Sequence, residues 1–226
     1  PDGKSIVFSY QGSIWRIPAT GGTMKRLAAV PGFAIEPCWS PDGKKIAFLH
    51  SKAGWFTGSV QVIDAESGKS LKKHDDIAGT GKIAFSSDGA KLLGTLRKGN
   101  QVPALRSLDI EEGTMASVVR WPAVRAHPWA LSTDGKSAVY VTNFDELGKK
   151  QGGDAGPFND VWKVPTGGRG EPELLVTFPA RIYDLCWSAD DKSLFVCTDL
   201  GTTHNDIWQI NLNDTEKPVK LTFGQA

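Results

Sequence analysis

The stretch CWSPDGKKIAF, residues 38–48, places a tight-turn tetrapeptide between two apolar segments. Proline presets the backbone for a turn, and Asp-Gly adds a hydrogen-bonding side chain and a residue that accepts positive φ. Variants of this stretch occur four more times in the 226 residues. They are PDGKSIVF (1–8), SSDGAKLLG (86–94), STDGKSAVY (132–140) and SADDKSLFV (188–196). The sequence therefore encodes a repeat protein.

The length of the repeat indicates its architecture. The aligned aspartates lie 40, 46, 46 and 56 residues apart at Asp2, Asp42, Asp88, Asp134 and Asp190. A period of about 40–50 residues with short strands is typical of a β-propeller, in which each repeat supplies a four-stranded blade. We predict an all-β propeller domain over residues 1–226, with about five four-stranded blades. The five repeats span about residues 1–39, 40–85, 86–131, 132–187 and 188–226.

Each repeat contains four strand-like segments. In the second repeat these are residues 34–40 before the turn, 44–50 after it, then 59–65 and 69–75. The third alternates apolar and polar residues as a half-buried strand does, and the fourth carries the lysines typical of an exposed edge. We expect the bulky residue before each turn to pack between blades. These residues are Trp39, Phe85, Leu131 and Trp187.

Charge and cysteine content exclude several classes of protein. Lys plus Arg number 26 and Asp plus Glu 25, without long runs of either sign, so a nucleic-acid partner is not expected. No apolar stretch approaches the roughly 20 residues that cross a bilayer, so membrane insertion is not expected either. The three cysteines have no CxxC spacing. We expect Cys38 and Cys186, each preceding a tryptophan, to be small buried apolar groups.

The repeats resemble those of TolB-type propellers, whose consensus reads P-x-W-S-P-D-G-K-x-I-A-F, then D-I-W/Y, G-G and L-T. The resemblance spans the chain and is weaker where SSDG and STDG lack proline and where SADD replaces Asp-Gly. It implies a bacterial propeller in the periplasm or outside the cell. Similar modules occur in the periplasmic Tol-Pal system, in tricorn-like proteases, in prolyl-oligopeptidase relatives and in large bacterial amidohydrolases. Residues 183–212 most resemble the propeller of multidomain metallohydrolases of the CehA/McbA type.

Strand counting indicates an incomplete ring. The sequence holds five copies of the second, third and fourth strands, but only four inner strands lead into a turn. An open propeller leaves sheet faces and an edge uncovered, which repeat proteins normally avoid. We therefore expect a piece of a longer chain whose ring has six or more blades.

No catalytic or metal-binding constellation is visible. The four histidines are far apart in sequence, and there is no HExxH, no GxSxG and no Gly-rich phosphate loop. The sialidase Asp-box differs in spacing, since glycine here follows aspartate directly. Asp160 and Asp206 each follow an asparagine and could be calcium ligands, but a cap on the preceding loop is the simpler interpretation. We predict no catalytic residues, no metal and no cofactor.

A binding surface is the remaining possibility. Six residues before each turn aspartate, near the start of each inner strand, the side chains are mostly polar, and the long loop 144–159 shares their end of the blades. We predict a ligand or partner site at this channel mouth, made by Glu36, Lys82, His127, Tyr183 and Asp184. The alternative is that these residues only line a water-filled channel. We expect the opposite end to offer only short turns.

Two functions are compatible with these features. The first is a non-catalytic propeller module that binds a protein, peptide or ligand. The second is the gating or scaffold propeller of a bacterial metallohydrolase or peptidase, whose catalytic domain, in the same chain, lies outside these residues. In the second case the chain's own catalytic domain is the partner.

Overall fold

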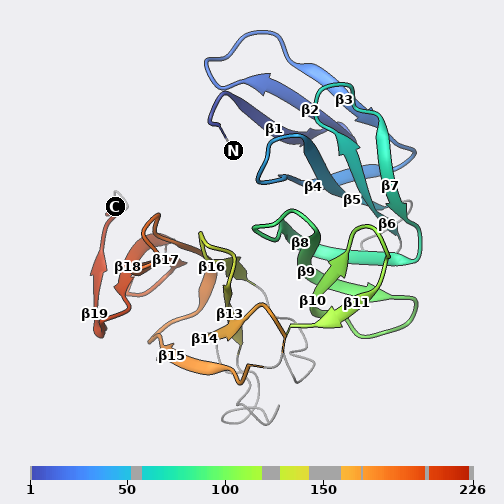
Figure 1. Ribbon diagram of the computed structural model, residues 1–226. Helices are drawn as coiled ribbons and strands as arrows, with labels where there is room; N and C mark the ends of the chain where they lie inside the picture. The colour runs from blue at the N-terminus through green and yellow to red at the C-terminus, as the bar shows by residue number, and fades with distance from the viewer. Residues whose placement is uncertain are drawn as a thin grey trace. The chain divides into compact units, whose positions relative to one another are not determined.

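The computed structural model describes residues 2–51, 58–118, 128–142, 159–168, 170–201 and 204–223. In these ranges the chain forms nineteen strands and no helix (Figure 1). The predicted all-β class is confirmed. A search of the described residues finds no helix with the length and apolar character needed to cross a bilayer.

The strands form one three-stranded and four four-stranded sheets among the described residues. The first sheet comprises β1 (Ser5–Tyr10), β2 (Ser13–Pro18) and β3 (Lys25–Ala29). The second comprises β4 (Phe33–Trp39), β5 (Lys45–Ser51), β6 (Gly58–Asp64) and β7 (Ser70–His74). The third comprises β8 (Ile77–Phe85), β9 (Lys91–Lys98), β10 (Ala104–Asp109) and β11 (Met115–Ser117).

The last two sheets follow the same order. The fourth comprises β12 (Trp129–Leu131), β13 (Ser137–Thr142), β14 (Asp160–Pro165) and β15 (Glu173–Thr177). The fifth comprises β16 (Ile182–Trp187), β17 (Ser193–Thr198), β18 (Asp206–Asn211) and β19 (Asp214–Lys220). In every sheet, strands adjacent in sequence pair antiparallel, so each sheet is a meander like a propeller blade. The predicted repeat boundaries fall between the first and second strands of these sheets.

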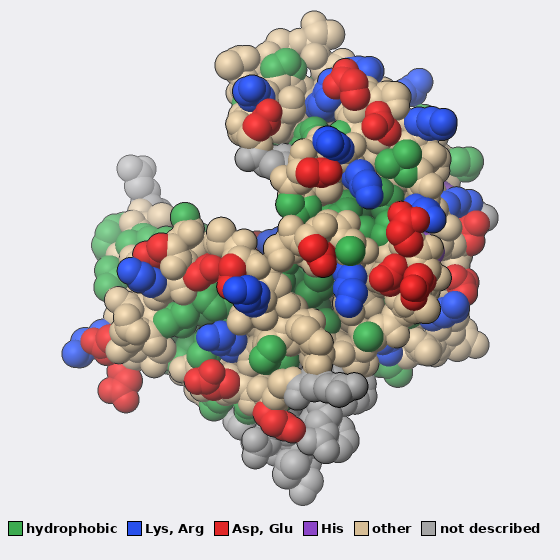
Figure 2. Space-filling model, viewed as in Figure 1, with side chains coloured by type: hydrophobic (Ala, Val, Ile, Leu, Met, Phe, Trp, Pro, Cys, Tyr) green, Lys and Arg blue, Asp and Glu red, His purple; other side chains and the backbone are tan. Residues whose placement is uncertain are grey.

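The chain divides into two compact units, residues 1–117 with the first three sheets and 118–226 with the last two. Each unit is described by itself, and the single domain over 1–226 stays a prediction. On the face shown in Figure 2, acidic and basic side chains are interspersed over each unit.

Apolar side chains fill the space between neighbouring sheets. In the first unit, Ile14 of the first sheet packs with Phe48 of the second, and Val62 of the second with Leu92 of the third. In the second unit, Val139 of the fourth sheet packs with Leu194 of the fifth. All six side chains are fully buried, as inter-blade packing requires.

The residues before the turns meet these cores to different degrees. Phe85 is buried, whereas Trp39 and Trp187 are half-buried and pack against the edges of their cores. The Trp187 indole Nε1 donates a hydrogen bond to the Ala130 carbonyl oxygen at 3.3 Å. Cys186 is exposed, so the prediction that it is a buried apolar group was wrong. Side chains alternate in direction along β16, and Cys186 lies on the face opposite to Leu185, which is buried.

A serine organises each complete turn between first and second strands. The Ser40 hydroxyl, in a residue only 2% exposed, donates to Asp42 Oδ1 at 2.6 Å and accepts from the Lys45 amide at 2.9 Å. Asp42 Oδ1 also accepts from the Lys44 amide at 3.0 Å. The same three bonds recur around Ser86, Ser132 and Ser188. The serine is therefore as much a part of the turn as Asp-Gly is.

The SADD variant keeps this turn by different means. Asp191 stands where the other copies have glycine and adopts a φ of 55°. Its carboxylate accepts hydrogen bonds from the Thr133 amide at 2.8 Å and from the Thr133 hydroxyl at 2.9 Å. Thr133 belongs to the turn of the adjacent sheet in the same unit, so this contact compensates for the strained backbone.

The last strand begins earlier than the sequence indicated. Residues 213–215, Asn-Asp-Thr, stand where the earlier repeats have the turns TGG, ESG and EEG, but β19 starts at Asp214, which pairs with Asn211. The Asn211 side chain accepts a hydrogen bond from the Asn213 amide at 2.9 Å and closes a two-residue turn. A register shift between Gln209 and Asn211 accommodates it.

We expect Ser40→Ala to lower the free energy of unfolding by about 1–3 kcal/mol, because it leaves the buried end of the turn without an acceptor for the Lys45 amide. Urea unfolding followed by tryptophan fluorescence measures this change. Ser9→Ala, on the exposed face of β1, is the matched control and should change the free energy by less than about 0.5 kcal/mol. Equal effects of the two substitutions would contradict this role for the turn serine.

The turn aspartates predict a loss of stability in acid. Hydrogen bonds from the Ser40 hydroxyl and the Lys44 amide hold the pKa of Asp42 below its ordinary value of 3.8, and the pKa of Asp88, Asp134 and Asp190 is lowered likewise. A depressed native pKa stabilises the fold above the unfolded-state pKa, and this contribution disappears as the pH falls through the native value. The urea concentration at the unfolding midpoint should therefore decrease as the pH is lowered below about 4. The decrease should be less steep in Asp42→Asn. A midpoint that rises in acid would contradict this.

Candidate functional site

Three inner strands carry a β-bulge at the positions chosen from the sequence. The pairing of β4 with β5 shifts register between Ile35 and Cys38, around Glu36. The pairing of β8 with β9 shifts between Thr80 and Ile83, around Lys82. Because a bulge re-aims side chains and interrupts strand pairing, these positions are suited to present polar groups rather than to continue the sheet.

The β16 strand repeats the arrangement. Its register shifts between Ile182 and Asp184, which leaves Tyr183 as the extra residue. Asp184 Oδ1 accepts a hydrogen bond from the next amide, that of Leu185, at 2.8 Å. Tyr183 is therefore unpaired at a bulge, as Glu36 and Lys82 are in their own sheets, and Asp184 beside it pairs with Cys197.

The backbone at Glu36 is unusual. It has a φ of 53°, and Gln11, Glu36 and Asp191 are the non-glycine residues with positive φ among those described. In β8 the corresponding bulge uses a glycine, Gly81, at a φ of 69°. A left-handed conformation disfavours a side chain with a Cβ, and backbone strain of this kind concentrates at functional sites. The glutamate side chain is thus retained at an energetic cost.

Glu36 and Lys82 both belong to the first unit and both lie within electrostatic range of Cys38. Both are exposed, and both act on the Cys38 thiol between β4 and β8. Burial of the thiol is the main cause that raises the pKa of Cys38 to about 12; the Glu36 carboxylate raises it further, whereas the Lys82 ammonium lowers it. Cys38 is thus an inert packing group beneath a pair of opposite charges.

The second unit surrounds Tyr183 with charged side chains that the sequence analysis missed. The Tyr183 hydroxyl donates to Asp199 Oδ2 at 3.0 Å, and the Arg181 guanidinium carbon lies 5.2 Å from the ring centroid. The hydrogen bond to Asp199 is the main cause that raises the pKa of Tyr183. The tyrosine remains 41% exposed, so its ring is available for contact. Arg181 directly precedes β16 and Asp199 directly follows β17, so both lie at the end of the sheet where the site was predicted. This position next to the strand ends could have identified them from the sequence.

Two exposed aromatic residues at the same end of the first unit were also missed. Phe33 begins β4 and is 59% exposed, and Tyr10 ends β1 and is 47% exposed. The Ala34 amide donates to the Gly12 carbonyl oxygen at 3.0 Å, which brings the turn after β1 against the start of β4. This end of the unit therefore combines charges of both signs with uncovered aromatic surface.

The remaining site predictions fall partly outside the structure. His127 and loop residues 144–158 lie outside the described residues, so their role in the site stays a prediction. Glu36 and Lys82 belong to the first unit and Tyr183 and Asp184 to the second, and each pair is placed within its own unit.

The two candidate calcium ligands bind protein groups of the fourth strands. Asp160 and Asp206 are each 2% exposed. Asp160 accepts from the Thr177 hydroxyl at 2.6 Å, and Asp206 pairs with the Lys220 ammonium at 2.7 Å and accepts from Thr222 at 3.1 Å. We expected caps on the preceding loops, but these bonds tether the outer strand of each sheet instead. In the part of the chain that the structure describes, no three His, Cys, Asp or Glu side chains converge on a metal position.

Comparison with family models gives no match to this sequence, and comparison with curated proteins gives none either. Solved structures do match. TolB from Acinetobacter baumannii is similar with a TM-score of 0.73 and 17% identity, over 100% of this chain and 55% of that one. Hydrazine synthase from Kuenenia stuttgartiensis is similar with a TM-score of 0.66 and 16% identity, over 100% of this chain and 64% of that one.

An oligogalacturonate lyase in complex with manganese is similar with a TM-score of 0.65 and 14% identity, over 100% of this chain and 64% of that one. At such identities the likeness shows the fold alone, and this chain has the TolB-like β-propeller fold that its repeats predicted. The chain spans between 55% and 64% of the length of these three structures.

The strained bulge makes a testable prediction. Glu36→Gly should be more stable than Glu36→Ala by about 1 kcal/mol, because glycine accepts a φ of 53° without a Cβ clash. The two variants lack the same carboxylate, so their difference isolates the backbone term. Urea unfolding of both proteins measures it. An alanine variant as stable as the glycine variant would show that β4 has no left-handed residue at this position.

Proposed function

We propose that this chain is a non-catalytic propeller module that binds a protein or peptide at the bulged ends of its inner strands. The observation that carries the proposal is the concentration of exposed aromatic and charged groups at this end of the first unit. Phe33 and Tyr10 offer apolar area beside Glu36 and Lys82. Interfaces commonly combine aromatic anchors with polar residues that determine orientation.

The second unit supports the same proposal. Tyr183 is exposed and is held by Asp199 and Arg181, so little side-chain entropy is lost when a partner packs against it. The adjacent Asp184 adds a negative charge. Tyrosine held in this way is a typical contact residue, because its ring is apolar and its hydroxyl polar.

The alternative, a propeller that gates or supports the catalytic domain of a bacterial hydrolase, is compatible with the same fold and stays a hypothesis. We further propose, from the resemblance to TolB-type repeats, that the protein acts in the bacterial periplasm or outside the cell. In both cases the propeller contributes recognition, and the chemistry resides in another domain or protein.

A peptide library displayed on phage provides a defined test. Peptides selected on the immobilised full chain should lose affinity by about tenfold for Glu36→Gln, Lys82→Gln or Asp184→Asn, because a charge-assisted hydrogen bond contributes about 1.5–3 kcal/mol. Fluorescence anisotropy of a labelled peptide measures the dissociation constants.

The matched controls change charge by the same amount elsewhere. The control substitutions are Glu216→Gln and Lys192→Gln. Glu216 lies on the outer strand β19, Lys192 lies at the turn end of the fifth sheet, and both residues are exposed. They should leave the affinity unchanged. Selected peptides that bind all three site variants as well as the unmodified chain would refute the proposed binding surface.

A further inference from the structure

A cavity of about 540 Å³ lies between the first and second sheets of the first unit, at the end that carries the SPDG turns. It is lined by the turn before β1, the end of β2 and the two turns that follow β4 and β6. Its volume falls within the range of small-molecule sites. Neither Glu36 nor Lys82 lines the cavity, and Glu36 lies three residues from Trp39 along β4, or about 10 Å away, so the cavity is separate from the site proposed above. The turns at this end are short, as expected, and the cavity lies between them.

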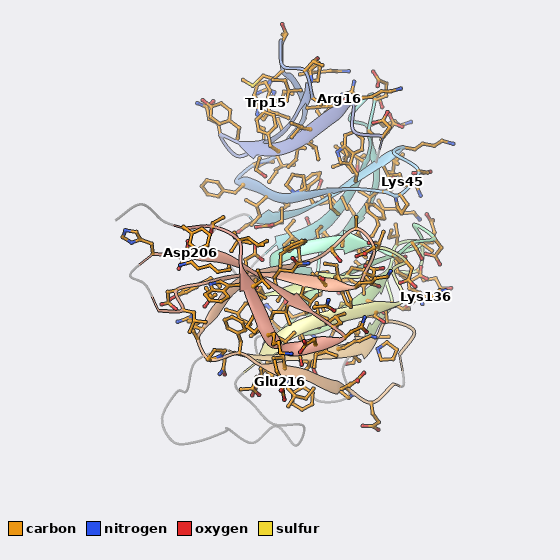
Figure 3. The ribbon with its side chains drawn as sticks, turned by 90° about the vertical axis from the view of Figure 1, so that its left-hand side faces the viewer. Trp15, Arg16, Lys45, Lys136, Asp206 and Glu216 are labelled. Atoms are coloured by element: carbon orange, nitrogen blue, oxygen red, sulfur yellow. The ribbon has the colours of Figure 1, made fainter. Side chains whose placement is uncertain are left out.

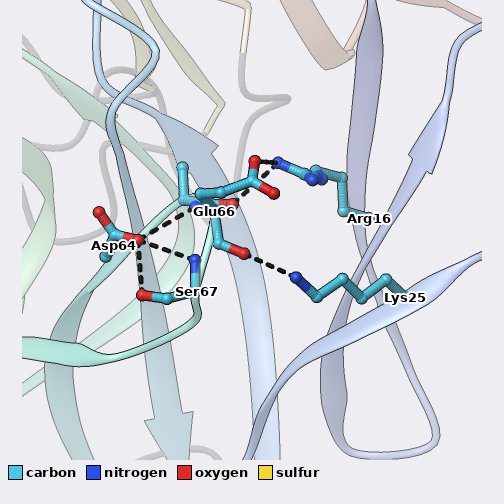
Figure 4. A network of polar contacts seen from close by, with 6 residues as sticks. Arg16, Lys25, Asp64, Glu66 and Ser67 are labelled. Carbon is cyan, nitrogen blue, oxygen red and sulfur yellow. Dashed lines mark hydrogen bonds and ion pairs between the residues drawn. The ribbon is translucent and has the colours of Figure 1, made fainter.

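One wall of the cavity is held by polar contacts between the two sheets (Figure 4). Arg16 Nη1 donates to the Ala65 carbonyl oxygen at 3.0 Å and to Glu66 Oε2 at 2.8 Å. The Lys25 ammonium donates to the Glu66 carbonyl oxygen at 2.8 Å. The wall is therefore already ordered, which lowers the entropic cost of binding a ligand.

The Arg16 side chain points to this wall because successive side chains of a strand extend to opposite faces. Trp15 and Arg16 are successive residues of β2, and their side chains extend to opposite sides of the strand (Figure 3). The Arg16 side chain is only 22% exposed. Both of its hydrogen bonds to described residues use Nη1, so Nε and Nη2 keep donors that no described residue binds.

The turn aspartates also keep free acceptors. Asp42 binds its turn through Oδ1, and Asp64 accepts from the Ser67 amide and hydroxyl through Oδ1 at 2.8 and 2.6 Å. Their Oδ2 atoms have no partner among the described residues. The Lys44 ammonium, in the same turn as Asp42, adds an exposed donor. Donors and acceptors without partners therefore line the cavity from β2 and from the two turns after β4 and β6.

The charges of the lining decide which ligand fits. Three basic and four acidic side chains surround the cavity, so they nearly cancel. An anionic ligand would meet the carboxylates, and a cationic one would meet the lysines and Arg16. A neutral ligand rich in hydroxyl groups meets neither penalty, because each hydroxyl donates to a carboxylate and accepts from an ammonium or guanidinium.

An aromatic surface completes the site. Trp39 lines the cavity, is half-buried and packs on the core between the first two sheets. An indole ring of this kind offers a rigid apolar surface to the C–H face of a sugar ring. We propose that this cavity is a binding site for a neutral saccharide.

Isothermal titration calorimetry of the full chain tests the proposal with named probes. These are the neutral sugars maltose, cellobiose and di-N-acetylchitobiose, the acidic digalacturonate, the basic glucosamine and the peptide glycylglycine. We expect saturable binding of at least one neutral disaccharide, and weaker or no binding of the charged probes. Lys44→Gln and Trp39→Phe should each weaken that binding by about tenfold.

Matched controls use the same repeat positions in the second unit. Lys136→Gln corresponds to Lys44→Gln, and Trp187→Phe corresponds to Trp39→Phe. These substitutions, and Glu36→Gln at the other end of β4, should leave saccharide binding unchanged, which distinguishes this site from the proposed peptide-binding surface. If Trp39→Phe does not fold, as judged by circular dichroism, Lys44→Gln alone decides.

Three outcomes would overturn the proposal. They are no saturable heat with any neutral disaccharide, binding of the acidic, basic or peptide probe in preference to the neutral sugars, and equal loss of binding in the control variants.

Discussion

The hydroxyl of one serine per turn is the contact on which the sheets of this protein depend. In the second sheet it is Ser40, buried between the first and second strands, which joins the Asp42 carboxylate to the Lys45 amide. The bond network sets the register of β4 against β5, and the apolar residues that follow are thereby directed into the space between sheets. A one-residue slip would move those residues to the opposite face.

A register set at one end of a strand leaves the other end free to vary. The bulges around Glu36, Lys82 and Tyr183 lie in inner strands whose opposite ends are held by serine turns. Irregular backbone is tolerated there because the turn and the inter-sheet core already specify the pairing. The serine turns and the proposed peptide-binding surface thus lie at opposite ends of the same strands.

The sequence was informative where the determining interactions are local. Turn chemistry and the repeat spacing predicted the sheets, since Ser40, Asp42 and Gly43 act within a few residues of one another. The spacing also located Glu36 and Lys82, although it did not reveal that they lie on bulges. The early start of β19 was missed because it depends on a side-chain bond from Asn211.

Contacts between sheets were beyond the reach of sequence reasoning. The exposure of Phe33 and the cavity beside Arg16 depend on how separate sheets pack. No spacing rule within one repeat contains that information. Asp191 illustrates the point, because its departure from glycine is explained only by Thr133 of the adjacent turn.

The central claim is that serine turns hold the inner strands in register while bulges at their other ends present polar side chains. A crystal structure of the full chain that resolves the carbonyl oxygens of β4, β8 and β16 tests it most directly. The account predicts a left-handed Glu36 and register shifts at all three bulges. Regular pairing through these positions, with a negative φ at Glu36, would contradict it.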